Sequence, residues 1–167
     1  MKTLMLMRHS HAVSNNPAYS DHDRPLTTAG RTLAESTATL LKSEGLVPDC
    51  IVCSSAARTV ETAQLVASTT GSPAEPHCTQ TLYLAKAQAY PTAVRQSAKS
   101  TDNVVLALGH NPGVASLVNA WSDEFLSFTP ASVAIFSLCI DDWSQLAEGL
   151  SEPPVLKGFI TEGRRQI

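Results

Sequence analysis

Short runs of apolar residues are spaced along this chain, and longer amphipathic segments separate them. A continuous apolar run of roughly four to eight residues is typical of a strand that is covered on both faces of a sheet. Such runs predict strands at 3–7, at 49–53, at 104–108 and from about Val133 onward. A weaker run at 155–161 predicts a further strand, which we place at the edge of the sheet.

Three segments between the predicted strands carry apolar side chains at helical spacing. The first covers about residues 28–44. The second follows the serines at 54–55, one of which we expect to be its N-cap, and it ends near Gly71. The third begins with Asn111 as the N-cap and Pro112 in the first turn, a combination that favours a helix start.

Strands and helices that alternate in this way predict an α/β fold. Because the strands are apolar throughout, both faces of the sheet should be covered by helices. We therefore expect a three-layer α/β/α sandwich with a mainly parallel sheet. The 167 residues show no internal repeat and no linker, so we treat residues 1–167 as a single domain.

Charged residues follow three of the predicted strands directly or after a short turn. The first strand leads into Arg8 and His9, the second leads through two serines to Arg58, and the third leads to His110. In open α/β sheets, ligands bind beyond the carboxyl ends of the strands, so these side chains are expected to converge there. Two arginines, two histidines and nearby helix N-termini form a pocket that suits a phosphoryl group.

The composition narrows the class of partner. A formal net charge of −3 argues against a general nucleic-acid binder, which needs lysines and arginines to neutralise phosphates. No run reaches the roughly 18 apolar residues of a membrane span, and the apolar run at the N-terminus is too short for a signal peptide. We therefore expect a cytoplasmic protein without a nucleic-acid or membrane partner, in which any anion site is local.

The four cysteines are expected to be reduced thiols in the core. Cys50 and Cys53 form a C-x-x-C sequence, but it lies in a predicted strand, where positions three residues apart face opposite sides of the sheet. A redox or zinc motif is therefore disfavoured. We also place Cys78 and Cys139 in the core.

Four short motifs in a fixed order resemble those of a known family. They are MRHSHA at 7–12, RPLTTAG at 24–30, SSAARTVET at 54–62 and GHNPG at 109–113. In these motifs the chain resembles the histidine phosphatase superfamily, which includes the phosphoglycerate mutases. Their order and spacing are most similar to the SixA-type phosphohistidine phosphatases, and the resemblance extends to about Ile140. It implies a phosphoglycerate mutase-like fold.

The resemblance also implies a role for each matching residue. His9 is the implied nucleophile that takes the phosphoryl group, while Arg8 and Arg58 hold the phosphoryl oxygens. Three further residues are implied to line the phosphate pocket: His110 as its second histidine, Arg24 and Asn15.

Two departures from the family pattern bear on activity. Ser10 replaces the glycine that usually follows the nucleophile, and this puts the backbone conformation there in question. The segment 79–88 contains no carboxylate, whereas the mutases and many phosphomonoesterases keep a glutamate there as a proton donor. The same loss is typical of the SixA-type group, so it points to the substrate rather than to inactivity.

The chemistry of these residue types supports a phosphatase that needs neither a metal nor another cofactor. A neutral imidazole, with an ordinary pKa of about 6.5, is a good nucleophile at physiological pH. Two guanidinium groups can bind phosphoryl oxygens without losing their charge. Passing the phosphoryl group through His9 divides the reaction into two easier steps, of which the second is attack by water.

The substrate is expected to be either a phosphorylated protein that bears phosphohistidine or a small phosphorylated metabolite. An alkoxide leaving group is strongly basic and needs a proton donor, whereas an imidazole can leave as a neutral ring. The missing carboxylate therefore favours phosphohistidine.

Three alternatives stay open at this point. The chain could be a small-molecule phosphomonoesterase of the same superfamily, or an inert module that binds phosphorylated proteins. It could also be a metallohydrolase, with these ligands: His9, His11, His22, His110, Asp21 and Asp23. The metal site is disfavoured because both aspartates lie in a predicted loop, and His11 and His22 are expected to be surface side chains.

Overall fold

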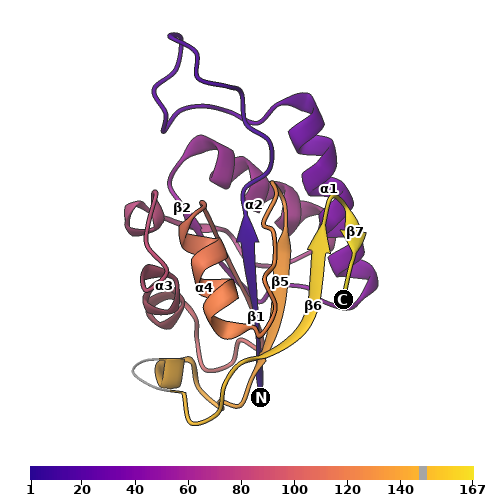
Figure 1. The fold of residues 1–167 in the computed structure, drawn as a ribbon, viewed down its shortest axis with the longest axis vertical. Coiled ribbons are helices and arrows are strands. Elements are labelled where there is room, and N and C mark those ends of the chain that lie inside the picture. Colours follow the sequence, from indigo (N-terminus) through magenta and orange to yellow (C-terminus); the bar gives the residue numbers. More distant parts are fainter. Residues whose placement is uncertain (147–149) are drawn as a thin grey trace.

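The strands of this chain pair into one mixed sheet. The computed structural model of the protein describes residues 1–146 and 150–167, and in these ranges the strand order is β3-β2-β4-β1-β5-β6-β7 (Figure 1). The strands are β1 (Lys2–Arg8), β2 (Cys50–Ser54), β3 (His77–Thr79), β4 (Val104–Gly109), β5 (Val133–Leu138), β6 (Val155–Thr161) and β7 (Arg164–Arg165).

The sheet is parallel on one side of β1 and antiparallel on the other. β1 pairs in parallel with β4, β4 with β2, and β2 with β3. β5 runs antiparallel to β1, β6 antiparallel to β5, and β7 antiparallel to β6. Since β6 therefore runs in the same direction as β1, the predicted mainly parallel sheet is confirmed.

Helices cover both faces of the sheet, as the apolar strands predicted. The helices are α1 (Thr28–Ser43), α2 (Ala57–Thr70), α3 (Ala89–Ser97) and α4 (Gly113–Trp121), with 3-10 turns at Gln80–Leu82 and Trp143–Leu146. On β1, Met5 and Met7 pack in the core cluster with α1 and α2, whereas Leu4 and Leu6 pack in the cluster with α3 and α4. Figure 1 shows how these helices are arranged around the sheet. The three-layer α/β/α architecture is thus confirmed. None of the helices in the described ranges is long and apolar enough to cross a lipid bilayer.

Both predicted N-caps are wrong by one or two residues, because the expected capping side chains are used elsewhere. The N-cap of α2 is Ala56, while the hydroxyl of Ser54 pairs with His110. The N-cap of α4 is Pro112, while the side-chain amide of Asn111 donates to a carbonyl in the segment before β5.

Other elements differ from the prediction at the edges of the sheet. The strand predicted at 155–161 is β6, but it is not at the edge, because the two-residue β7 pairs with its outer side. The edge strand β3 and the helix α3 were not predicted. β3 has only three residues and two of them are exposed, so it lacks the apolar run that identified the other strands.

The cysteines follow the prediction only in part. Cys50 and Cys53 lie on opposite faces of β2, as expected for positions three apart, and Cys53 is fully buried. The prediction that Cys78 and Cys139 are core residues is wrong, since both are exposed. Cys78 is on the edge strand β3, and Cys139 follows the last residue of β5.

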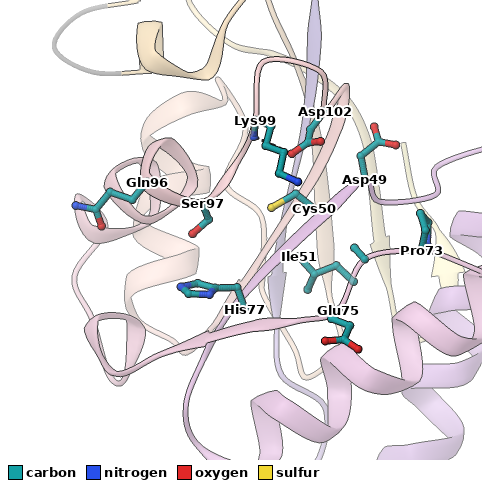
Figure 2. Close-up of a pocket in the computed structure, with 11 residues that line it drawn as sticks. Asp49, Cys50, Ile51, Pro73, Glu75, His77, Gln96, Ser97, Lys99 and Asp102 are labelled. Atoms are coloured by element: carbon teal, nitrogen blue, oxygen red, sulfur yellow. Dashed lines mark hydrogen bonds between the residues drawn. The ribbon is translucent and has the colours of Figure 1, made fainter.

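A cavity of about 450 Å³ opens at the amino-terminal ends of β2, β3 and β4 (Figure 2). Its polar lining includes His77, Lys99 and Asp102. None of the residues that the sequence assigned to the phosphate pocket lines it. The candidate site lies at the opposite, carboxyl-terminal ends of these strands.

Candidate active site

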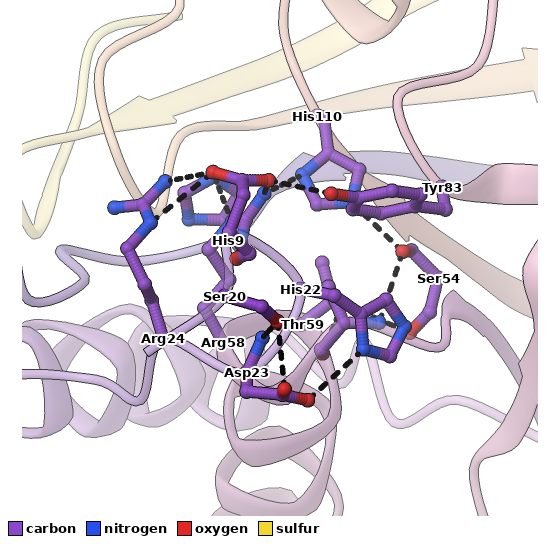
Figure 3. Close-up of polar contacts among 12 residues, drawn as sticks. His9, Ser20, His22, Asp23, Arg24, Ser54, Arg58, Thr59, Tyr83 and His110 are labelled. Carbon is purple, nitrogen blue, oxygen red and sulfur yellow. Dashed lines mark hydrogen bonds and ion pairs between the residues drawn. The ribbon is translucent and has the colours of Figure 1, made fainter. Parts of the chain in front are cut away.

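The topology brings the four main candidates together at one end of the sheet. β1 ends at Arg8 and is followed by His9, and β4 ends at Gly109 and is followed by His110. Because Arg8 and Gly109 are register partners in adjacent parallel strands, the two histidines meet, with ring centroids 5.2 Å apart. Arg58 reaches them from the first turn of α2, which follows the neighbouring β2 (Figure 3).

His9 is oriented by its own backbone neighbour. Its Nδ1 lies 2.7 Å from the carbonyl oxygen of Ser10, which can only accept, so Nδ1 carries the proton. Nε2 then keeps its lone pair, and Nε of Arg58 lies 3.3 Å from it as a donor. Burial, against the opposing effect of the Ser10 hydrogen bond, lowers the pKa of His9 to about 4, and the nearby arginines act in the same direction. His9 is therefore a neutral imidazole at neutral pH, with its basic nitrogen at the arginine.

Arg8 has donor capacity that the described residues leave unused. Its Nη1 donates to the carbonyl oxygen of Phe128 at 2.9 Å, and the same oxygen accepts from the side-chain amide of Asn111. Its buried Nε has no hydrogen-bond partner within residues 1–146 and 150–167. Burial lowers the pKa of Arg8 from its ordinary value, but a guanidinium stays charged at physiological pH. An anion beside His9 would find a charged donor there.

Arg58 is a buried cation whose main partner is one residue of the loop after β1. Only 2% of its side chain is exposed. Nη1 donates to the backbone carbonyl of Asp21 at 2.5 Å, and Nη2 lies 3.1 Å from the Asp21 carboxylate. Nη2 also lies 3.4 Å from Nδ1 of His110, so the guanidinium touches both histidines. His9, Arg58 and His110, with the side chains that bond to them, form the polar cluster of the site.

Several hydrogen-bond donors hold the Asp21 carboxylate. Besides Arg58, it accepts from Nη2 of Arg24 at 2.7 Å and from the Tyr83 hydroxyl at 2.6 Å. The hydrogen bonds from Tyr83 and Arg24, together with the charge of Arg58, hold the pKa of Asp21 well below its usual range. The cluster thus binds an ionised carboxylate, and the geometry shows that these donors can share one anion.

His110 is fixed through both its ring and its backbone. Nε2 lies 2.8 Å from the Ser54 hydroxyl, and the buried Tyr90 hydroxyl lies 3.1 Å from the His110 amide nitrogen and 3.3 Å from its carbonyl oxygen. Tyr90 packs so close to Gly109 that a Cβ at that position would lie 2.2 Å from the hydroxyl. Burial, followed by the charges of His9 and Arg58, lowers the pKa of His110 to about 3. Like His9, it is neutral at physiological pH.

Ser10, which stands where the resemblance leads one to expect glycine, has no backbone strain. It is not among the residues with a positive φ, so the turn after His9 does not require glycine. Its side chain is fully buried, and its hydroxyl donates to the carbonyl oxygen of Gly30 at 2.7 Å. The Ser10 hydroxyl therefore links the turn after His9 to α1.

Arg24 and Asn15, the other two residues predicted at the phosphate, lie in different surroundings. Arg24 belongs to the cluster through its hydrogen bonds to Asp21, and it also donates to the carbonyl oxygen of Val13. Asn15 is exposed in the loop between β1 and α1 and has no side-chain hydrogen bond with the cluster in the described parts of the chain. Its role at the phosphate stays a prediction.

The structure adds residues that sequence reasoning did not assign to the site: Asp21 as an anchor of the cluster, Tyr83, Tyr90, Ser54, His22 and Ser55. His22, expected at the surface, is only 35% exposed, and its Nε2 lies 2.9 Å from the Ser55 hydroxyl. Its ring packs edge-on against Tyr83. Since Asp21 and Tyr83 are 62 residues apart in sequence, no local pattern could have linked them.

The residues proposed for the metallohydrolase alternative are not gathered around one point. His11 is exposed, whereas His9 and His110 lie in the cluster with Arg58. Within residues 1–146 and 150–167, no group of three or more His, Cys, Asp or Glu side chains is placed to hold a metal ion.

Part of the chain matches a known protein family, and most of it is similar to a plant protein. Residues 4–82 match the histidine phosphatase superfamily (branch 1). An uncharacterized chloroplastic protein of Arabidopsis thaliana is 28% identical over 160 residues, which cover 91% of this chain and 73% of that protein. The matched segment contains His9, Arg24 and Arg58, while His110 lies beyond it.

Solved structures with a similar fold cover nearly the whole chain. A protein assigned as the phosphohistidine phosphatase SixA of Agrobacterium tumefaciens is 24% identical, with a TM-score of 0.78 over 96% of this chain and 97% of that one. One assigned in the same way from Nakamurella multipartitia is 26% identical, with a TM-score of 0.77 over 96% and 95%. The protein histidine phosphatase SixA in complex with tungstate is 21% identical, with a TM-score of 0.78 over 96% and 97%.

Proposed function

The chain belongs to the histidine phosphatase superfamily and has the fold of its SixA-type members, and on this premise we propose that Nε2 of His9 takes the phosphoryl group from the substrate. One observation carries the proposal. The proton of His9 is fixed on Nδ1 by the carbonyl of Ser10, so the unprotonated Nε2 faces the guanidinium of Arg58. The proposed nucleophilic nitrogen thus lies next to the positive charge that would bind the phosphoryl oxygens.

In the first step, a bond forms between phosphorus and Nε2 of His9 while the bond from phosphorus to the leaving group breaks. Arg8 and Arg58 stabilise the negative charge on the phosphoryl oxygens in the transition state. The proton on Nδ1 stays with His9, and its hydrogen bond to the Ser10 carbonyl stabilises the positive charge that forms on the imidazole.

In the second step, a water molecule attacks phosphorus, and the bond to Nε2 breaks. The electron pair returns to the ring, which restores neutral His9 and releases inorganic phosphate. His110 lies beside His9 as a neutral imidazole, with Nδ1 toward the Arg58 guanidinium and Nε2 at the Ser54 hydroxyl.

The Asp21 carboxylate supports the placement of the phosphoryl group. It is an anion held by Arg58, Arg24 and Tyr83 next to the nucleophile. A phosphoryl group carries the same kind of acceptor oxygens with more charge, so we infer that it displaces Asp21 from these donors or shares them with it.

We propose protein phosphohistidine as the preferred substrate, because among the described residues the cluster offers no carboxylic acid that could protonate a basic leaving group. The low pKa of Asp21 keeps this carboxylate ionised, so it cannot donate a proton at neutral pH. Its hydrogen bond to the Tyr83 hydroxyl raises the pKa of that phenol. An alkoxide leaving without a donor loses about 10²–10⁴-fold in rate, whereas the imidazole of phosphohistidine leaves as a neutral ring.

We also propose that catalysis needs no metal or other cofactor and that residues 1–167 act as one histidine phosphatase domain, since strands from both halves of the chain pair in one sheet. Full activity after dialysis against a chelator is the expected result for metal independence. The cytoplasmic location stays a prediction.

A parallel assay of the purified chain tests the substrate class. Equal concentrations of a phosphohistidine protein, phosphoramidate, an aryl phosphate and an alkyl phosphate are compared by the release of inorganic phosphate. We expect the first two to be hydrolysed fastest, the aryl ester of an acidic phenol at an intermediate rate and the alkyl ester slowest. A higher kcat/KM for the alkyl phosphate would favour the small-molecule phosphomonoesterase, and binding without turnover of any substrate would favour the inert module.

A further inference from the structure

Two cysteines face each other across the pair of strands that borders the candidate active site. β2 and β3 are parallel neighbours, and Cys53 and Cys78 are register partners in them. Their sulfur atoms are 3.4 Å apart, and both thiols are free. This pair is distinct from the C-x-x-C sequence, whose first member lies on the other face of β2.

The backbone already satisfies the distance that a disulfide needs. Neighbouring strands are about 4.7–4.9 Å apart, and the Cα atoms of disulfides are usually about 4.4–6.8 Å apart. Because register partners project their side chains to the same face, only the sulfur atoms have to approach each other, by roughly 1.4 Å. Small rotations about the two Cα–Cβ bonds supply a movement of this size.

The two sulfur atoms differ in access. Cys78 is exposed on the edge strand, so an oxidant in solution can reach it. Cys53 is fully buried in the core cluster between the sheet and the helices α1 and α2. Burial and the neighbouring Cys78 raise the pKa of the Cys53 thiol, which stays protonated and is shielded from direct attack.

We propose that Cys53 and Cys78 form an oxidative modification site, at which hydrogen peroxide converts the two thiols into one reversible disulfide. The sulfur of Cys78 attacks one peroxide oxygen, the O–O bond breaks, and a sulfenic acid and one water are formed. The sulfur of Cys53 then attacks the sulfur of Cys78, and the hydroxyl group leaves as a second water with the thiol proton of Cys53. Two thiols thus lose two electrons to one peroxide, which is reduced to two waters.

The disulfide would join strands next to residues of the phosphate pocket. Cys53 precedes Ser54, whose hydroxyl holds Nε2 of His110 at 2.8 Å. Cys78 precedes Thr79, whose carbonyl oxygen accepts from the amide of Ser55 at 3.1 Å. A shift of either cysteine moves these contacts, so the oxidised protein should turn over substrate more slowly. This consequence rests on the proposed function, whereas formation of the disulfide does not.

Peptide mapping of the folded full chain tests the site. The protein is treated with a small excess of hydrogen peroxide, the remaining thiols are alkylated, and the tryptic peptides are analysed by mass spectrometry without reduction. Because Cys50 and Cys53 share the tryptic peptide 43–58, a Cys50→Ser background makes the assignment unique. We expect peptide 43–58 linked to peptide 59–86, lighter than the sum of the two thiol peptides by two hydrogen atoms and separated again by dithiothreitol.

Two variants at exposed positions serve as matched comparisons. Cys78→Ser should abolish the linked peptide, while Cys139→Ser should leave its yield unchanged. Recovery of Cys53 and Cys78 as separate alkylated residues after peroxide treatment would overturn the proposal, as would Cys78 present only as sulfinic acid or in a bond between two chains. The reduced protein could lack phosphatase activity and still give the linked peptide after peroxide treatment. That result would support the disulfide site and refute the proposed function.

Discussion

Among single residues, the site depends on one buried arginine charge and on two histidines that stay neutral. His110 is buried and His9 is partly buried, and this burial keeps both imidazoles neutral; each touches the same guanidinium. Arg58 is itself almost fully buried, and the Asp21 carboxylate balances its charge. A buried cation with one carboxylate partner, beside the proposed nucleophile His9, is suited to bind a second anion.

Replacing Arg58 by Ala should weaken oxyanion binding and slow turnover together, because the guanidinium serves the ground state and the transition state. The expected loss in kcat is roughly 10²-fold. Lysine should restore only part of it, since an ammonium group cannot form two parallel hydrogen bonds. Tungstate inhibition and steady-state kinetics provide the two measurements. The exposed Arg31, which pairs with Glu61, is the matched control. Unchanged tungstate affinity in Arg58→Ala would place the phosphate elsewhere.

Replacing Asp21 by Asn should make phosphate and tungstate bind more tightly. The substitution keeps the backbone carbonyl that accepts from Arg58, but it removes the negative charge that competes with the ligand. Isothermal titration with tungstate should show a dissociation constant several-fold lower than that of the wild type. Asp23→Asn, a change of the same kind at an aspartate that bonds Ser20 and His22, should have little effect. Weaker binding in Asp21→Asn would mean that the carboxylate chiefly positions Arg58.

At the scale of elements, the ends of strands carry the site and are also what the sequence predicted best. Arg8, His9 and His110 follow buried apolar runs, so their position at the carboxyl edge followed from the pattern alone. Arg58 could be placed because α2 follows β2 after a short turn.

The parts that the sequence did not predict depend on contacts between distant segments. The loop that carries Asp21 has no periodic pattern, and it is positioned by Arg58 and Tyr83. Ser54 and Asn111, expected as helix caps, bond instead to His110 and to the Phe128 carbonyl. These partners are distant in sequence, so the contacts depend on the tertiary structure. Exposure of Cys78 follows from a three-residue edge strand that leaves no signal in the sequence.

Replacing Tyr90 by Phe should lower both stability and activity, because the buried hydroxyl of α3 satisfies the backbone of His110. The His110 carbonyl keeps its bond from the Val114 amide, but leaving the buried His110 amide without the hydroxyl costs about 1–3 kcal/mol in the free energy of unfolding. Urea unfolding measures this cost, and kcat should fall as His110 becomes less well positioned. The half-exposed Tyr19, replaced by Phe, is the control. Wild-type stability in Tyr90→Phe would show that the hydroxyl does not hold this strand end.

At the scale of the whole molecule, the buried neutral histidines link the catalytic site to the pH dependence of folding. In the folded protein His9 and His110 take up protons only near pH 4 and pH 3, because burial lowers their pKa values. In the unfolded chain a histidine does so near pH 6.5. Between these values the unfolded state binds more protons, so the free energy of unfolding decreases as the pH falls.

The variant His110→Gln should therefore lose less stability than the wild type when the pH is lowered from about 6.5 to about 4. The difference should be on the order of 1 kcal/mol or more, since each unit of pKa shift corresponds to about 1.4 kcal/mol. Urea unfolding across this range measures it. Parallel curves for the two proteins would indicate that His110 is not held neutral in the folded state.

Trapping the phosphorylated enzyme decides whether His9 carries the phosphoryl group. Enzyme mixed rapidly with a labelled phosphohistidine protein or phosphoramidate is quenched in alkali, which preserves phosphorus–nitrogen bonds, and the labelled residue is located by mass spectrometry. We predict phosphohistidine at His9, its loss in His9→Ala together with a fall in turnover of at least about 10³-fold, and its retention in the control His11→Ala. Phosphate on another residue, or turnover that survives in His9→Ala, would contradict the account.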